Sequence, residues 1–355
     1  MRPTRCYHSK GSNSRSCKVC VYPYVYKWYL GAFHAGRRSE VAKKPYNPIL
    51  GETFHCYWHL KGYEESLKST NKPSKVKATN SESESQLTID ASSSHANGTG
   101  LFPWVDDPNA LVFYGEQVSH HPPISAFYAE HPRKKISLNA HIWTKSKFLG
   151  LSISVQNIGH ATLTLLNGPR EDYVLNFPNG YVRSILTVPW VELGGPVTIS
   201  CAQTGYNAKV EFMTKLFFSG ERNKINAQVF GPEEKKKPFL VVDGEWNGVM
   251  SGKWADGRTE RGFVDVNSLK IQTKKTKPIA QQEPYESRRL WKHVTKALKF
   301  NDVEGASKAK MAVEDRQRLD AKEREEGKST WRPRMFEKSG DNWNFVKTLD
   351  KRQTS

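Results

Sequence analysis

The chain has 355 residues, of which 37% are hydrophobic, and its formal net charge at pH 7 is +18. This length can bury the core of one large domain or of two ordinary ones. So basic a chain indicates an anionic partner, which could be nucleic acid, an acidic membrane surface or a phosphorylated ligand. No apolar run reaches the ~20 residues of a membrane-spanning helix. The basic, polar first residues lack the apolar core of a signal peptide.

Residues 1–26 are irregular and basic, and they show no hydrophobic period. The chain contains five cysteines, Cys6, Cys17, Cys20, Cys56 and Cys201. These are few and scattered, so we expect reduced thiols in a cytosolic protein. Cys17 and Cys20 have the spacing of half a zinc site, but no second pair follows at the spacing of a zinc finger. Residues 28–38 are apolar enough for a short helix.

The first polar motif, KKPYNPILGE, covers residues 43–52. Its two prolines are three residues apart and forbid a regular element, so we expect an ordered turn. One interpretation is a proline-stiffened surface loop. The other is a bend that presents Lys44 and Asn47 to a ligand. Strand-like residues 53–58 follow it, and residues 64–100 are so rich in Ser, Thr, Asn, Lys and Glu that a flexible insertion is predicted.

The second motif, EQVSHHPP, covers residues 116–123 and follows a strand-like run at 111–114. Pro122 and Pro123 have no N–H to donate, so the strand must break there. Neighbouring side chains on a strand point to opposite faces, and such a corner is needed for His120 and His121 to reach one ligand together. The pair could donate hydrogen bonds to an anion or bind a metal.

From residue 136 onward, short runs of alternating apolar and polar residues follow one another. Asn-Gly and Asp-Gly pairs at 179–180, 243–244 and 247–248 predict hairpin turns between them. Short strands joined in this way over about 200 residues predict one antiparallel sheet that curls into a barrel. A large barrel encloses a cavity that an apolar ligand can fill.

Residues 305–327 are rich in strong helix formers, so a charged helix is predicted there. Lys310, Glu314 and Arg318 recur every four residues and therefore share one face. A solvated helix with internal salt bridges is the simpler interpretation of this charge pattern. The aromatic residues within 331–337 are expected to pack back on the barrel.

Four motifs together resemble the oxysterol-binding protein family: KPYNPILGE at 44–52, EQVSHHPP at 116–123, the segment 184–195, and GEWNG at 244–248. The resemblance extends from about residue 28 to residue 346. It implies a mainly β (α+β) fold: a large near-closed antiparallel β-barrel that encloses a lipid tunnel, with a short N-terminal helix and a C-terminal helical region. The lipid-binding domain would occupy residues 27–345, and residues 346–355 would form a tail.

The resemblance also implies a function without catalysis. Members of the family exchange phosphatidylinositol 4-phosphate for a sterol or phosphatidylserine between membranes. The residues that this family pattern assigns to the lipid headgroup are Lys44, Asn47, His120, His121, Lys310, Glu314 and Arg318, with Glu52 as a weaker candidate. No metal and no cofactor other than the lipids is implied. Expected partners are anionic membranes, at the endoplasmic reticulum, Golgi or endosomes, and heteromers with related family members in longer forms.

Residues 1–26 do not resemble the family's lid segment, so we expect weaker retention of lipid than in a chain with such a lid. Two other classes of function compete with lipid binding. A nucleic-acid-binding protein would account for the charge and the many aromatic residues, although no recognition motif is present. A metal-dependent hydrolase could use His55, His59, His120 and His121, but no carboxylate lies beside them at the spacing of metal ligands.

Overall fold

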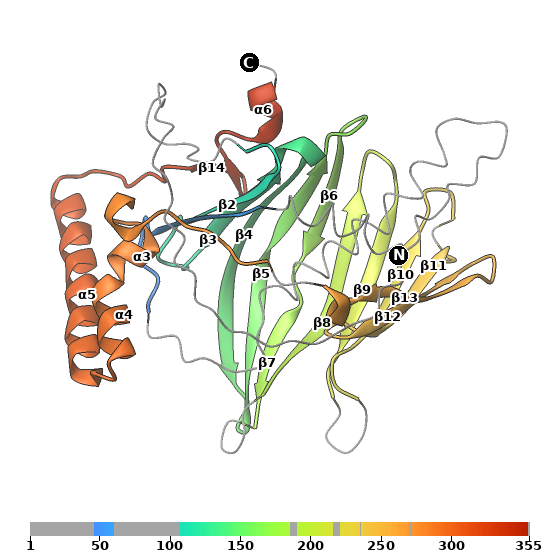
Figure 1. Cartoon of the computed structure of the whole chain (residues 1–355), viewed down its shortest axis with the longest axis horizontal. Helices are drawn as coiled ribbons and strands as arrows, with labels where there is room; N and C mark the ends of the chain where they lie inside the picture. The colour runs from blue at the N-terminus through green and yellow to red at the C-terminus, as the bar shows by residue number, and fades with distance from the viewer. Residues whose placement is uncertain are drawn as a thin grey trace, which may run out of the picture.

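A computed structural model describes residues 46–59, 107–184, 190–215, 221–234, 236–269 and 272–353. The expected irregular segment 1–26, the expected helix at 28–38, Lys44 and the insertion 64–100 lie outside these residues. One large sheet dominates the described part, with the helices of residues 287–326 gathered at one side of it and the C-terminal helix apart from them (Figure 1). None of the helices described is long and apolar enough to cross a membrane.

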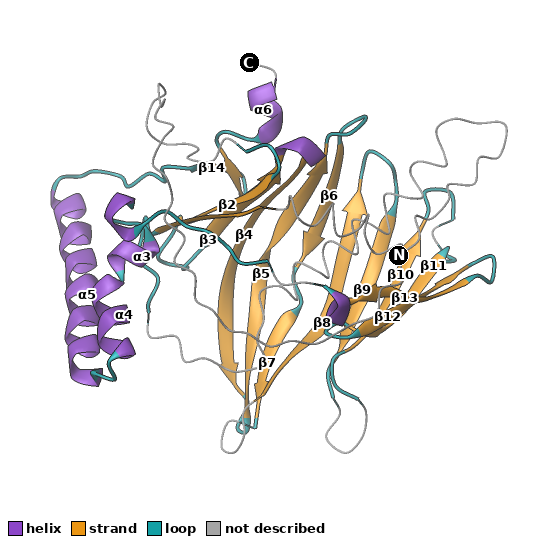
Figure 2. Cartoon of the chain, in the orientation of Figure 1, coloured by secondary structure: helices purple, strands orange, loops and turns teal. Residues whose placement is uncertain are grey.

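The main sheet of the described chain has thirteen antiparallel strands (Figure 2). They are β1 (Thr53–His59), β2 (Ala110–Gln117), β3 (Ser125–His131), β4 (Ile136–Phe148), β5 (Ser152–Leu165), β6 (Glu171–Asn176), β7 (Asn179–Arg183), β8 (Trp190–Cys201), β9 (Asn207–Met213), β10 (Lys224–Phe230), β11 (Leu240–Glu245), β12 (Val249–Trp254) and β13 (Thr259–Asp265). A small second sheet contains β14 (Phe336–Ser339) and β15 (Asn342–Phe345). The α-helices are α3 (Ser287–Leu290), α4 (Lys292–Lys299), α5 (Val303–Glu326) and α6 (Leu349–Gln353), and short 3-10 turns are η1 (Pro132–Lys134), η2 (Val266–Ser268) and η3 (Ile279–Gln281).

The strands of the main sheet lie in sequence order, apart from β7, which pairs with β5 and β8. Sequential neighbours pair because short connections favour antiparallel hairpins. The sheet fans and twists across the molecule, with β1 at one edge and β13 at the other (Figure 1). This architecture confirms the predicted mainly β class with one large, barrel-like antiparallel sheet.

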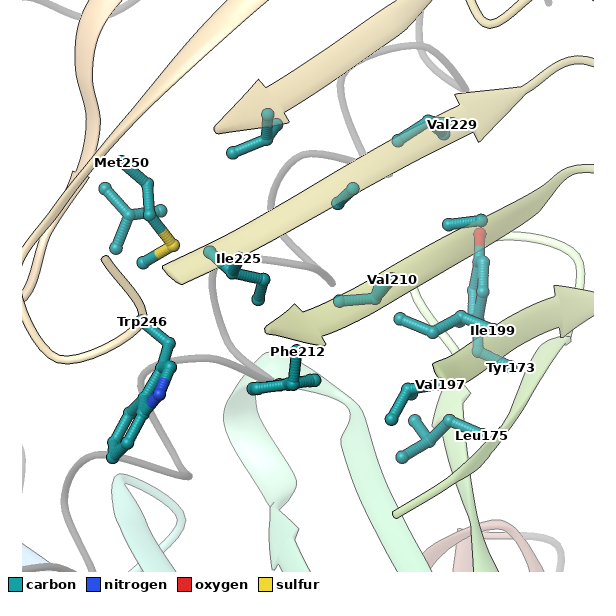
Figure 3. Close-up of a cluster of buried hydrophobic side chains, with 14 of the residues drawn as sticks. Tyr173, Leu175, Val197, Ile199, Val210, Phe212, Ile225, Val229, Trp246 and Met250 are labelled. Carbon is teal, nitrogen blue, oxygen red and sulfur yellow. The ribbon is translucent and has the colours of Figure 1, made fainter. Parts of the chain in front are cut away.

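The core of the sheet follows the period of two that the sequence predicts. In β9, buried Ala208, Val210 and Phe212 alternate with exposed Lys209 and Glu211. The same alternation continues on the neighbouring strands β8 and β10, so their apolar side chains form one continuous cluster (Figure 3). Burial of this apolar surface, worth about 25 cal/mol per Å², holds the successive hairpins together.

Two of the three expected hairpin turns are wrong. Asn179 and Gly180 begin β7, because Pro178 just before them cannot donate to the ladder and the strand breaks there instead. Gly244 lies inside β11, where its φ is +146° and a Cβ would meet the Val249 carbonyl oxygen at 2.3 Å. The absence of a side chain at Gly244 therefore lets β11 and β12 approach each other closely. The Asn247-Gly248 pair does lie in the turn between β11 and β12.

The C-terminal segment packs on the outer strands, as expected for residues 331–337. Met335, Phe336 and Phe345 are buried, and the Phe345 ring stacks on Tyr128 with centroids 4.3 Å apart. Helix α6 continues this contact, since the backbone N–H of Leu349 donates to the Tyr128 hydroxyl at 2.9 Å. The region expected only as a tail therefore contains a docked helix.

The two described cysteines are free thiols in the core. Burial raises the pKa of Cys56 to about 12, so this thiol stays protonated at neutral pH. Cys201 lies at the end of β8 and is buried as well. Both behave as small apolar residues in the packing.

His55 makes the stability of this fold depend on pH. Burial, with nearby Lys277 and Arg334, lowers the pKa of this side chain from 6.5 to about 4. The unfolded chain therefore takes up the proton first, and stability is lost as the pH falls from 6.5 toward 4. We expect His55 to account for about 2 kcal/mol of the stability lost between about pH 7 and pH 4.5. Urea unfolding of wild type and His55→Gln at both pH values isolates this contribution, and an identical pH dependence in the two proteins would contradict it.

Candidate functional site

The first polar motif crosses between the sheet and the helices. On the sheet side, the N–H of Gly51 donates to Gln117 O at 2.9 Å, and the N–H of Gln117 donates to Glu52 O at 2.8 Å. On the helix side, Ile49 is buried among residues of α4 and α5. The Tyr46 hydroxyl also lies 2.7 Å from the Thr295 hydroxyl of α4. The segment is thus held from both sides as an ordered bend.

This bend presents Asn47 to α5. The Asn47 side-chain amide donates a hydrogen bond to the Glu314 carboxylate. Further along the same bend, the backbone N–H of Leu50 donates to the Gln317 side-chain oxygen at 2.7 Å. Of the two interpretations of this motif, the geometry favours the bend that presents side chains over the free surface loop.

The second motif forms the turn between β2 and β3. The N–H of Val118 donates to Ile124 O at 2.9 Å, which closes the turn. The Gln117 side chain donates to Ser119 O at 2.9 Å and accepts from the Ser125 hydroxyl at 2.7 Å. The break predicted at Pro122 and Pro123 thus coincides with a turn. The side-chain hydrogen bonds of Gln117 stabilise the start of this turn.

His120 and His121 lie side by side at this turn, with ring centroids 4.4 Å apart and planes inclined by 61°. His121 is exposed and His120 is half-buried. The corner therefore does what the sequence predicts, since it lets two adjacent imidazoles face one region of space. The His121 ring is open to a ligand that reaches this surface, and the His120 ring lies half-buried beside it.

Gln317 on α5 determines which ring nitrogen of His120 carries the proton. Gln317 Nε2 lies 3.4 Å from His120 Nε2, and the glutamine oxygen already accepts from Leu50. The amide nitrogen can only donate, so His120 Nε2 is the acceptor and its proton resides on Nδ1. Burial, and to a lesser degree the neighbouring His121, lowers the pKa of His120 and keeps the ring neutral. Its Nδ1 is buried without a hydrogen-bond partner in the described part of the protein.

Helix α5 begins and ends close to its predicted limits, 305–327. The Asp302 side chain caps it by accepting from the N–H of Gly305 at 2.8 Å. Lys310 lies 3.7 Å from Glu314, and their side chains are 31% and 20% exposed. Because Glu314 also contacts Asn47, Lys310 is linked to the first motif through Glu314.

Arg318 does not join these contacts. Its side chain is 67% exposed and forms an ion pair with Asp315 on the same helix. Gln317, one residue earlier, makes the contact with His120. The spacing of Lys310, Glu314 and Gln317 (i, i+4, i+7) follows the 3.6-residue period more closely than i, i+4, i+8. This period is the signal that could have identified Gln317, which the sequence reasoning missed.

Two motif carboxylates hold the site's framework together. The indole N–H of Trp291 donates to Glu52 Oε1 at 3.1 Å, which ties the start of α4 to the first motif. Glu116 is buried, and its two oxygens accept from the N–H groups of Arg334 and Met335, each at 2.8 Å. Glu52 is thus placed against a helix, and a headgroup role for it stays a prediction.

A cavity of about 550 Å³ adjoins this framework. It is lined by Ile49, Leu50, Gly51, Tyr285, Gln317, Asp320, Glu323, Arg324, Ser329, Trp331 and Arg334. Leu50 and Gln317 belong both to this cavity and to the hydrogen-bond chain that ends at His120. Gln317, which contacts the histidine turn, therefore also lines a recess of ligand size.

The described residues contain no group of three or more His, Cys, Asp or Glu placed to hold a metal ion. Of the histidines considered for a hydrolase, His55 lies edge-on to the Tyr114 ring, with centroids 5.4 Å apart. His59 lies 3.1 Å from Asp107. His59 thus pairs with a carboxylate, whereas His55 Nε2 is buried without a hydrogen-bond partner among the described residues. His120 and His121 form a separate pair.

A family model described as oxysterol-binding protein matches residues 12–301 of the chain. The chain belongs to the oxysterol-binding protein family. It is 49% identical over 328 residues to oxysterol-binding protein-related protein 9 of Mus musculus, with 92% of this chain and 40% of the relative covered. It is 42% identical over 330 residues to related protein 10 of Homo sapiens, with 91% and 39% covered. Related protein 11 of Homo sapiens is 41% identical over 325 residues, with 91% and 41% covered.

The motif details predict a likeness to related protein 9, with 10 and 11 as near relatives, and these identities agree with it. The chain spans about 40% of the length of the curated relatives it matches. Its fold resembles the Osh1 ORD domain in complex with ergosterol, with a TM-score of 0.62, 22% identity, and 97% of this chain and 77% of that chain covered. It also resembles the Osh3 ORD in complex with PI(4)P from Saccharomyces cerevisiae, with a TM-score of 0.61, 18% identity, and 94% and 78% covered.

Lys310 provides a direct test of the helix face. Lys310→Ala should weaken the binding of a soluble short-chain phosphatidylinositol 4-phosphate at least about tenfold, since one charge-assisted hydrogen bond is worth ~1.5–3 kcal/mol. Lys322→Ala is the matched control, because Lys322 forms an ion pair with Glu326 of the same spacing and the same 3.7 Å length as that of Lys310 with Glu314. Calorimetric titration of both variants measures the difference. Equal, small losses would indicate a merely solvated helix.

Proposed function

We propose that this domain binds the headgroup of phosphatidylinositol 4-phosphate at His120 and His121 and exchanges this lipid for a sterol or phosphatidylserine between membranes at contact sites. The observation that carries the proposal is the buried Nδ1 of His120, which has no hydrogen-bond partner among the described residues and lies at a turn held by the first motif and by α5. A buried donor without an acceptor is costly, and a ligand oxygen would satisfy it.

The charges around the turn suit a phosphomonoester. Such a group carries about −1.5 to −2 charges at neutral pH and three strong acceptor oxygens. His121 is exposed and free to turn toward it, and Lys310 lies on the helix that holds His120 through Gln317. The phosphate would raise the pKa of both imidazoles and so strengthen them as donors. Asn47 and Glu314 would then contact the polar inositol ring.

The family supports the lipid class. One structural relative, the Osh1 ORD domain, is described in complexes with ergosterol and with cholesterol, and a second, the Osh3 ORD, in complex with PI(4)P. The proposal extends these ligands to the present chain, while phosphatidylserine rests on the sequence resemblance alone. Binding and release need no covalent step, so the domain would act as a carrier. We place it in the cytoplasm, peripheral at endoplasmic reticulum, Golgi or endosomal membranes, with heteromers of related members as possible assemblies in longer forms.

Competition between two lipids tests the exchange. Purified protein is mixed with liposomes that contain phosphatidylinositol 4-phosphate or phosphatidylinositol, and the extracted lipid is quantified. We expect extraction of the 4-phosphate alone, and displacement of it by sterol or by phosphatidylserine liposomes. Equal extraction of phosphatidylinositol would contradict a phosphate-specific site. Native mass spectrometry of the same preparation distinguishes bound lipid from the nucleic acid that the basic charge could otherwise attract.

A further inference from the structure

The β4–β5 hairpin extends beyond β3, the strand that pairs with β4. β4 and β5, with 13 and 14 residues, are the longest strands described. The ladder with β3 ends at the Ser125–Ile142 pair, so the last six residues of β4 pair only with β5. Their turn lies at one end of the sheet, at the bottom of Figure 1, away from the C-terminal helix α6. The hairpin tip therefore extends beyond β3 on the β4 side, while on the β5 side β7 pairs with it as far as Ser152, opposite Arg183.

This tip exposes large apolar side chains. Phe148 is 67%, Leu149 46% and Leu151 56% exposed, and they are separated only by Gly150. The tip is ordered, because the N–H of Leu149 donates to Ser152 O at 2.8 Å and Phe148 pairs with Ile153. Isolated exposed apolar residues are common, but three within four residues at a turn at the end of the sheet mark an interaction surface.

The charge around the tip selects its partner. Lys145 and Lys147 are exposed on β4 just before the apolar residues. No Asp or Glu occurs between Arg133 and Arg170, so the whole hairpin carries positive charge without a compensating acid in its own sequence. Apolar side chains at a tip with lysines behind them match the chemistry of an anionic bilayer, in which the apolar groups enter the acyl boundary and the lysines meet the lipid phosphates.

We propose that the β4–β5 tip, residues 145–151, is a membrane-docking element that inserts into anionic bilayers. It is separate from the headgroup site and would work for any lipid that the domain carries. A second exposed apolar pair, Phe300 and Val303 between α4 and α5, is 75% and 72% exposed. It lies beside Asp302 and Glu304, so its charge is mixed and it serves as the matched control.

Vesicle co-sedimentation tests the proposal. Phe148→Ser with Leu149→Ser and Leu151→Ser should reduce binding to phosphatidylcholine vesicles with 20% phosphatidylserine at least about tenfold. Lys145→Glu with Lys147→Glu should reduce it at least about tenfold in the same vesicles, with little effect on the weak binding to pure phosphatidylcholine. Phe300→Ser with Val303→Ser should leave binding within about twofold of wild type. Unchanged binding of both tip variants, or an equal loss in the control, would overturn the proposal.

A second measurement separates this surface from the headgroup site and from misfolding. The tip side chains are exposed, so thermal unfolding of the variants should match that of wild type. Their affinity for a soluble short-chain phosphatidylinositol 4-phosphate should also be unchanged. Loss of short-chain binding in folded tip variants would overturn a separate docking role. If wild type itself binds no soluble lipid but still binds vesicles through the tip, the proposed function fails while the docking element stands.

Discussion

Alanine at both His120 and His121 should abolish the extraction of phosphatidylinositol 4-phosphate from liposomes while the protein stays folded. Two charge-assisted hydrogen bonds at ~1.5–3 kcal/mol each correspond to a loss in affinity of about a hundredfold or more. Stability should change little, because His121 is exposed and the His120 ring makes a long, 3.4 Å hydrogen bond with Gln317. Lipid extraction and circular dichroism measure the two effects.

His59→Ala is the control for this experiment. This histidine is also half-exposed on the same sheet, but it pairs with Asp107 at 3.1 Å and lies outside the β2–β3 turn. It should extract lipid as wild type does. A folded double variant of His120 and His121 that extracts lipid undiminished would end the assignment of the headgroup site.

His120 and His121 should also make the affinity for the phosphorylated headgroup depend on pH. In the free protein, burial lowers the pKa of His120, so the ring is neutral at pH 7. A bound phosphate would raise that pKa, and binding would then take up a proton. Affinity should therefore weaken as the pH rises from about 6.5 to about 8, a range in which the phosphate itself is mostly dianionic. The single variant His120→Ala, which keeps His121, should bind more weakly and show less of this dependence when its affinity is titrated at both pH values.

Glu116→Ala should destabilise the protein by roughly 2–6 kcal/mol. The buried carboxylate accepts from the N–H groups of Arg334 and Met335, and each donor left without an acceptor costs ~1–3 kcal/mol. Burial raises the pKa of Glu116 although these two N–H groups oppose the shift. The loss should first appear as faster amide exchange of the segment that leads into β14, and as a lower midpoint of urea unfolding.

Two further variants test whether the loss of stability in Glu116→Ala is due to the missing hydrogen-bond acceptors. Glu116→Gln keeps one carbonyl oxygen as an acceptor and should cost less than alanine does. Glu304→Ala removes an exposed glutamate that pairs only with Lys308 on the surface of α5, and it should change stability by less than ~0.5 kcal/mol. If Glu116→Ala is as mild as Glu304→Ala, the carboxylate does not hold the C-terminal segment on the sheet.

Local pattern in the sequence determined the strands, the break between β2 and β3, and helix α5. The reason is that strand alternation, the missing proline donor and helix propensity act between residues close in the chain. Alternating Ala208, Val210 and Phe212 could be assigned to one face without any knowledge of the rest. The same holds for Pro122 and Pro123, whose effect on the ladder is intrinsic. The headgroup residues were predicted from the family resemblance, which assigns roles to positions in the sequence but does not say which side chains contact one another.

Only the tertiary structure decided which residues meet. Gln317 contacts His120 across 197 positions of sequence, Glu116 reaches Met335 across 219, and Glu52 reaches Trp291 across 239. Such contacts depend on how the sheet and the helix pair pack, and no local period encodes them. Gly244 shows the same limit, since its Asp-Gly pair has the composition of a turn and yet lies inside β11. The close approach of Val249 on the next strand requires a residue without a Cβ there.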